Sequence, residues 1–196
     1  MFEIESAKIV LLGSFNPYII SPEWLKERSI WTPSDVRRNL GGGARDGAQF
    51  RGDGTEWIVT AERLVIASVT TDCGLLVDGL LAVLPHTPLS AVLSSFAFAI
   101  TPSDSNAETT HDIFDAIRAR TPRGFDAELL RWGVVLHRDQ TRIDLTFVSG
   151  EQGVTVAVNH RRTARTANEA RQAGNKFIGD RDVSEQLIRD MARPSA

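Results

Sequence analysis

The stretch ELLRWGVVLHRDQTRIDLTFVSGEQGVTVAVNHRR, residues 128–162, decides the fold class of this chain. It contains three strand-like segments, which are joined by the short polar turns RDQT and SGEQG. Strands that follow one another through short turns pair in antiparallel fashion. The stretch therefore predicts a three-stranded antiparallel meander in the C-terminal part of the chain.

Further strands are predicted upstream of this meander. In TEWIVTAERLVIASVT, residues 55–70, apolar side chains alternate in both arms of a hairpin, and TAER forms the turn. Residues 7–16 are a short apolar run closed by glycine, asparagine and proline, which predicts a buried strand. Residues 89–100 follow two prolines and predict another strand.

Amphipathic segments between the strands predict helices. Residues 21–30 begin with Ser21 as N-cap and a proline at the first helical position, and residues 72–84 place apolar residues at helical spacing after Asp72. Residues 108–122 and 182–193 predict two more short helices. Hairpins with helices on one side indicate an α+β protein, with a largely antiparallel sheet and helices packed on one face.

The glycine-rich stretch at residues 31–51 predicts a mobile connection. It is polar and basic, with GGGARDG at its centre. Backbone amides of such a loop could surround a phosphate, with Arg45 or Arg51 supplying charge. Because the stretch lacks the Walker lysine and the strand-to-helix context, we favour the flexible connection.

Length and composition indicate one domain. A chain of 196 residues with 42% hydrophobic content can bury one substantial core over residues 1–196. Two sub-lobes, 1–101 and 107–196, that share a sheet are the alternative organisation. The chain shows neither a signal peptide nor a run of about 18 apolar residues, so we expect a cytoplasmic protein without a membrane partner. Arginine outnumbers lysine 19 to 3, which is typical of a GC-rich bacterial genome.

Three short motifs carry a resemblance to a family. GSFNPYIISPEWL, the ERL segment and LPHTPLSAV together resemble a pattern in bacterial proteins of about this length that have no assigned function. The resemblance covers most of the chain and implies an α+β domain. It implies no catalytic residue.

The histidines and the cysteine do not form a recognisable catalytic or metal motif. His86 lies between two prolines and predicts a corner after a helix, and no HxH, HExxH or CxxC element accompanies His111, His137 or His160. Cys73 is the only cysteine, which excludes an intrachain disulfide. We read it as a small packed residue, although a thiol at a helix N-terminus could be a nucleophile. We expect no metal and no cofactor.

Charge is the clearest functional signal in the sequence. The net charge is −3, yet residues 159–181 hold six basic side chains against two acidic ones. The basic segments 37–51 and 161–176 are therefore the predicted binding surface, with Arg37, Arg38, Arg45, Arg51, Arg161, Arg162, Arg165, Arg171 and Lys176 as candidates. Exposed arginines of this kind would be removable with little effect on stability.

Three functional hypotheses follow. The favoured one is a non-enzymatic binding or assembly module that contributes to a larger complex, with a protein partner or a second copy bound at an exposed strand edge. The alternative is a nucleic-acid-binding accessory protein that uses the two basic segments. The third is an enzyme whose site gathers scattered residues such as Asp46, Asp53 and His86.

Overall fold

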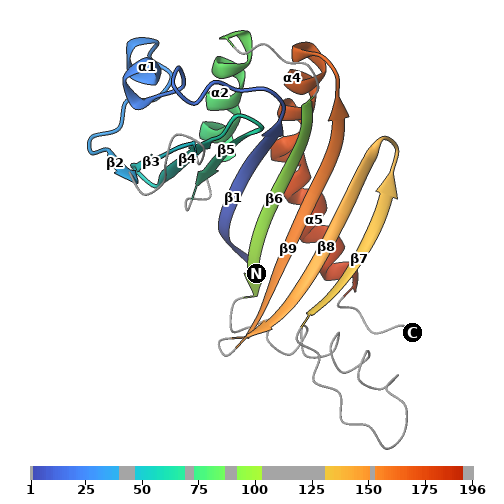
Figure 1. The fold of residues 1–196 in the computed structure, drawn as a ribbon. Helices are drawn as coiled ribbons and strands as arrows, with labels where there is room; N and C mark the ends of the chain where they lie inside the picture. The colour runs from blue at the N-terminus through green and yellow to red at the C-terminus, as the bar shows by residue number, and fades with distance from the viewer. Residues whose placement is uncertain are drawn as a thin grey trace, which may run out of the picture.

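The computed structural model describes residues 2–39, 47–68, 73–86, 92–102, 131–150 and 153–191. In these ranges the chain forms one antiparallel sheet of nine strands, with helices packed on one of its faces (Figure 1). The predicted α+β class, with a largely antiparallel sheet, is confirmed. The predicted helix at 108–122 lies outside the described residues.

The sequence order of the elements alternates groups of strands with helices. The strands are β1 (Phe2–Leu12), β2 (Arg37–Asn39), β3 (Ala48–Gly52), β4 (Thr55–Val59), β5 (Arg63–Ser68), β6 (Val92–Pro102), β7 (Arg131–Arg138), β8 (Thr141–Gly150) and β9 (Gly153–Ala164). The helices are α1 (Pro22–Glu27), α2 (Cys73–Val83), α4 (Ala167–Asn175) and α5 (Phe177–Met191), and a 3₁₀ turn at Leu84–His86 follows α2.

The strands lie in the order β2-β3-β4-β5-β1-β6-β9-β8-β7. In the first half of the chain β5 returns to pair with β1, and in the second half β9 returns to pair with β6. The two halves meet at the central antiparallel pair β1–β6 (Figure 1). Each half therefore repeats one topology, in which the last strand of a meander pairs with the strand that precedes the meander.

The predicted hairpin and meander are both present. The turn between β4 and β5 is closed by a hydrogen bond from the Thr60 N–H to the Arg63 carbonyl at 2.8 Å. Helix α1 begins as predicted, because the Ser21 hydroxyl accepts a hydrogen bond from the Trp24 N–H at 3.2 Å. The prediction for Asp72 concerns a residue outside the described ranges.

The prediction of a loop across residues 31–51 is wrong at residues 37–39 and 48–51. Strand β2 and strand β3 form there, and β3 turns into β4 through Asp53 (φ 47°) and Gly54 (φ 73°). This is the Asp-Gly pair that two-residue hairpin turns favour, because both central residues need positive φ. The triglycine segment, at residues 40–46, lies outside the described residues.

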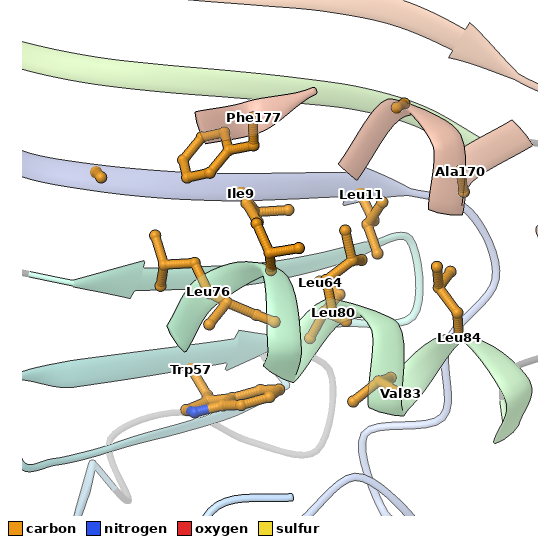
Figure 2. Packing of buried hydrophobic residues seen from close by; sticks show 14 of the residues in the cluster. Ile9, Leu11, Trp57, Leu64, Leu76, Leu80, Val83, Leu84, Ala170 and Phe177 are labelled. Carbon is orange, nitrogen blue, oxygen red and sulfur yellow. The ribbon is translucent and has the colours of Figure 1, made fainter. Parts of the chain in front are cut away.

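The hydrophobic core lies between the sheet and the layer formed by α2, α4 and α5. Figure 2 shows Leu76 and Leu80 on the side of α2 that faces Ile9 and Leu64, with Phe177 of α5 nearby. Cross-strand partners share a face of a sheet, so the strand register defines core rows directly. One such row runs through Phe50, Trp57, Ile66 and Ile9 and continues beyond β6 through His160, Ile143 and Leu136. A histidine thus occupies the middle of an otherwise apolar row.

None of the helices in the described ranges is long and apolar enough to cross a lipid bilayer.

Candidate functional site

The open face of the sheet is the side turned away from α2, α4 and α5. One row of it can be followed by register across all nine strands, through Arg37, Arg51, Glu56, Ala67, Lys8, Ala97, Asn159, Asp144 and Val135. This row lies beside the buried row and alternates with it along every strand, as the two-residue period of a strand requires. The open face is therefore the broad surface that no helix covers in the described structure.

Basic side chains dominate this open face. Among the described strand side chains it carries seven cations, namely Lys8, Arg37, Arg51, Arg63, Arg131, Arg142 and Arg161, against the two carboxylates of Glu56 and Asp144. Helices α2, α4 and α5 carry the opposite balance, with six carboxylates against three arginines. Arg162, Arg165 and Lys176 lie on the same side as these helices and bring its charge close to balance. The open face is therefore the more basic of the two sides of a chain whose net charge is −3.

Both carboxylates of the open face are already bonded to neighbours. Asp144 accepts a hydrogen bond from the Nε atom of Arg142 at 2.7 Å and forms an ion pair with the Nε atom of Arg161 at 2.8 Å. Glu56 accepts one from the Gln49 side-chain amide at 2.8 Å. Among the described residues no ion pair engages four of the cations, namely Lys8, Arg51, Arg63 and Arg131. These four are the cations most available to a partner.

The first predicted basic segment is divided between the two faces. Arg37 and Arg51 lie on the open face, where they line a surface depression of about 410 Å³. Arg38 points to the other side and pairs with Glu23 of α1. Arg45 lies outside the described residues. Strands β4, β5, β1 and β6 separate β3 from β9, so about 24 Å of sheet lies between the two basic segments.

The second segment is divided as well, and Arg162 is not a surface residue. Arg161 is on the open face with 44% of its side chain exposed, whereas the Arg162 side chain is 12% exposed and lies under α5. There its two terminal nitrogens donate to the two carboxylate oxygens of Asp180, both at 2.5 Å. Neighbouring residues of a strand point to opposite faces, which is why the adjacent arginines differ.

The remaining candidates of this segment belong to the helix side. Arg171 is exposed on α4, and Arg165 and Lys176 line a groove of about 720 Å³ between α4 and the β7–β8 turn. Glu169 also lines the groove, and its carboxylate accepts a hydrogen bond from the Arg165 N–H at 2.5 Å as part of the α4 cap. With Arg162 and Asp139, three cations and two carboxylates line this groove, so the groove is only weakly basic.

Sequence reasoning missed Lys8, Arg63, Arg131 and Arg142. Lys8, Arg63 and Arg142 are each the only Lys or Arg of their strand, and Arg131 is separated from Arg138 by the length of β7, so no local cluster of charge marks these four residues. The available signal was the alternation of polar and apolar residues, because Lys8 stands between two core residues and Arg63, Arg131 and Arg142 each precede a residue that packs in or against the core.

A buried polar network lies beneath β9. His160 Nε2 lies 2.8 Å from the Ser184 hydroxyl, and His160 Nδ1 lies 3.5 Å from an Asp180 carboxylate oxygen. The Ser184 hydroxyl donates its proton to the Asp180 carbonyl at 2.7 Å, so its oxygen accepts from His160 Nε2–H. Burial, the largest effect, lowers the pKa of His160 to about 4; Asp180 raises the pKa and Arg162 lowers it.

Serine, histidine and aspartate together could suggest nucleophilic catalysis. This set does not fit that chemistry, because Ser184 is fully buried and its hydroxyl proton is held by a helix carbonyl. Asp180 is moreover bonded to Arg162. The network therefore joins α5 to β9 and offers no reacting atom to a substrate.

The buried histidine makes stability depend on pH. Because the pKa of His160 is about 4 in the folded protein and 6.5 is its ordinary value, the unfolded chain binds the extra proton first as pH falls. We expect the free energy of unfolding to decrease by about 3 kcal/mol between pH 7 and pH 4. Urea titrations across this range measure the slope, and His160→Gln should flatten it. A slope that the substitution leaves unchanged would assign the effect to other groups.

The other scattered candidates do not assemble into a site. Asp53 accepts hydrogen bonds from the N–H and hydroxyl of Ser34, which lower the pKa of its carboxyl and fix the β3–β4 turn. His137 is exposed on β7, and the backbone of His86 ends the turn after α2. Asp46 and His111 lie outside the described residues. Within the described part of the chain no three His, Cys, Asp or Glu side chains are grouped as metal ligands.

Comparison of the sequence with protein-family models gives no match, and comparison with curated proteins gives none either, so the family resemblance stays a prediction.

Proposed function

We propose that the protein is a non-enzymatic binding module that contributes the open face of its sheet to a larger complex. The observation that carries this proposal is the excess of positive charge on the open face, which holds seven cations and two bonded carboxylates, whereas cations and carboxylates nearly balance on the helix side. A surface of one sign attracts and orients a partner of the opposite sign. The partner is therefore one that presents clustered negative charge.

An acidic protein surface is the partner that the open face fits best. Exposed apolar side chains, among them Leu12, Val135 and Val148, stand between the cations, as they do in protein interfaces. Among the described open-face side chains the imidazole of His137 is the only ring, and no Phe, Tyr or Trp is present on which an unpaired base could stack. These two features favour a folded acidic partner over single-stranded nucleic acid.

Duplex nucleic acid is the second candidate. The four cations that have no ion pair among the described residues, Lys8, Arg51, Arg63 and Arg131, are spread over both halves of the sheet, and an extended phosphate backbone could contact them together. Such contacts need no aromatic side chain. The distribution of these cations over both halves of the sheet is the specific observation that supports duplex nucleic acid as a second candidate partner.

The proposal is tested by neutralising three of these four cations. We expect the triple variant Lys8→Gln, Arg51→Gln, Arg63→Gln to bind an acidic probe about tenfold more weakly, at about 0.5 kcal/mol for each lost contact. Fluorescence anisotropy with a labelled polyglutamate peptide and a labelled DNA duplex measures both classes of partner at several salt concentrations. For the duplex, the salt slope should decrease by up to about three.

A matched control removes the same charge from the other side. Lys26→Gln, Arg171→Gln and Lys176→Gln are exposed positions away from the open face, and this variant should bind like the unmodified protein. Equal weakening by both variants would show that total charge, and not the open face, governs binding. Tighter binding of the duplex than of the peptide would favour the second candidate.

A further inference from the structure

The sheet ends in two edge strands that differ in their protection. Strand β2 has three residues, two of which are arginines, so it offers little to pair with. Strand β7 has eight residues, and its central segment Gly133–Leu136 contains neither charge nor proline. No strand in the described ranges pairs with the outer side of β7. Long apolar edges of this kind pair readily with another strand.

The β7–β8 turn indicates which backbone groups of β7 point outward. Arg138 lies opposite Thr141, with only two residues between them, so this closing pair exchanges hydrogen bonds within the hairpin. Bonded and non-bonded pairs alternate along an antiparallel ladder. The N–H and C=O groups of Gly133, Val135 and His137 are therefore directed away from β8.

We infer that a second copy of this chain pairs with the outer edge of β7, antiparallel, with the two-fold axis at Val135. In this register Val134 lies opposite Leu136 of the second copy, and Trp132 lies opposite Arg138, as a cation and a ring can pair. Arg131 comes opposite Asp139, the first turn residue. At both ends of the paired strands, a residue of one copy therefore faces a residue of complementary chemistry in the other copy.

The neighbouring register is less favourable. With the axis at Val134, Arg131 would lie opposite His137, and Asp139 would lose its cationic partner. Val135 is also the most suitable residue for the axis, because 44% of it is exposed although it is aliphatic. The register with the axis at Val135 therefore covers apolar surface and pairs opposite charges at the same time. This inference concerns the sheet edge and does not rest on the proposed function of the open face.

The first test removes the outward hydrogen bond. We expect the unmodified chain to dimerise reversibly at a concentration on the order of 100 µM, as small interfaces do. Val135→Pro should abolish the dimer, since it deletes an N–H that β8 does not use. Sedimentation velocity measures the mass, and the melting temperature verifies that the monomer is folded. An unmodified chain that stays monomeric to about 1 mM, or a Val135→Pro variant that still dimerises, would overturn the inference.

The second test addresses the register and does not depend on proline. Val135→Lys places two like charges on the axis and should weaken the dimer roughly fivefold, and Val135→Asp should do the same. An equimolar mixture of the two variants should recover the dimer, because the introduced charges then face each other. Val148→Lys is the matched control, since Val148 is 41% exposed on β8, one strand inside the edge. Mixtures that do not recover, or a control as weak as Val135→Lys, would contradict pairing at Val135.

Discussion

Replacement of Arg162 with alanine is expected to lower the free energy of unfolding by about 3–5 kcal/mol. The substitution leaves the carboxylate of Asp180, whose side chain is 7% exposed, without the guanidinium that holds it. An unpaired charge at a buried position costs far more than the net contribution of the intact pair. Denaturant titration at pH 7 measures the loss, which corresponds to about 10 °C in melting temperature for a chain of this size.

Arg161→Ala is the matched control for this experiment. The two arginines are consecutive residues of β9, and each pairs with an aspartate. The Arg161 side chain is 44% exposed, so its loss should change stability by no more than about 0.5 kcal/mol. Equal costs for the two substitutions would contradict the burial of the Arg162–Asp180 pair.

Trp57→Ala is the second large effect, again about 3–5 kcal/mol. Trp57 is 1% exposed and lies in an aromatic cluster, with ring centroids 6.2 Å from Phe50 and 6.1 Å from Trp31. Helix α2 approaches it so closely that a Cβ atom on Gly79 would lie 3.3 Å from the indole. Removal of the ring would therefore leave a cavity between β4 and α2. The backbones of these two elements cannot move together to fill it.

The conservative variant separates volume from hydrogen bonding. Within the described structure the buried indole N–H of Trp57 has no hydrogen-bond partner. Trp57→Phe keeps most of the apolar volume and removes this unsatisfied donor, so it should cost less than about 1 kcal/mol. Thermal unfolding of both variants tests the assignment. A Trp57→Phe variant as unstable as Trp57→Ala would show that the indole nitrogen is bonded in the folded protein.

The elements that local sequence specifies were predicted correctly. The β4–β5 hairpin, the β7–β8–β9 meander and the N-cap at Ser21 all depend on residues within a few positions of one another. Strand β2 could not be found in this way, because three polar residues become a strand only by pairing with β3. Strand β3 could have been found from the Asp53–Gly54 turn that follows it.

The candidate site was harder to predict because it is assembled across strands. Contiguity in the sequence predicts one surface for the arginines of residues 161–165, yet Arg161 and Arg162 lie on opposite faces of the sheet. The partner of Arg162 is Asp180, which a helix brings back over the sheet. Lys8 and Arg51 belong to one face only because the register of three successive strand pairings aligns them.

The central position of the first strand has a consequence for how the chain folds. Ile9 of β1 lies opposite Ile66 of β5 on one side and Phe96 of β6 on the other. Strand β1 is synthesised first, but its second partner, β6, is synthesised only after β5 and α2. Pairings between residues this distant in sequence form slowly, because loop closure precedes any gain from contacts. We expect the pairing of β5 with β1 and the pairing of β9 with β6 to form first within their own halves, and the pairing of β1 with β6 to form afterwards. During synthesis the free edge of β1 is consequently the surface most prone to aggregation, from the completion of β5 until β6 and β9 have left the ribosome.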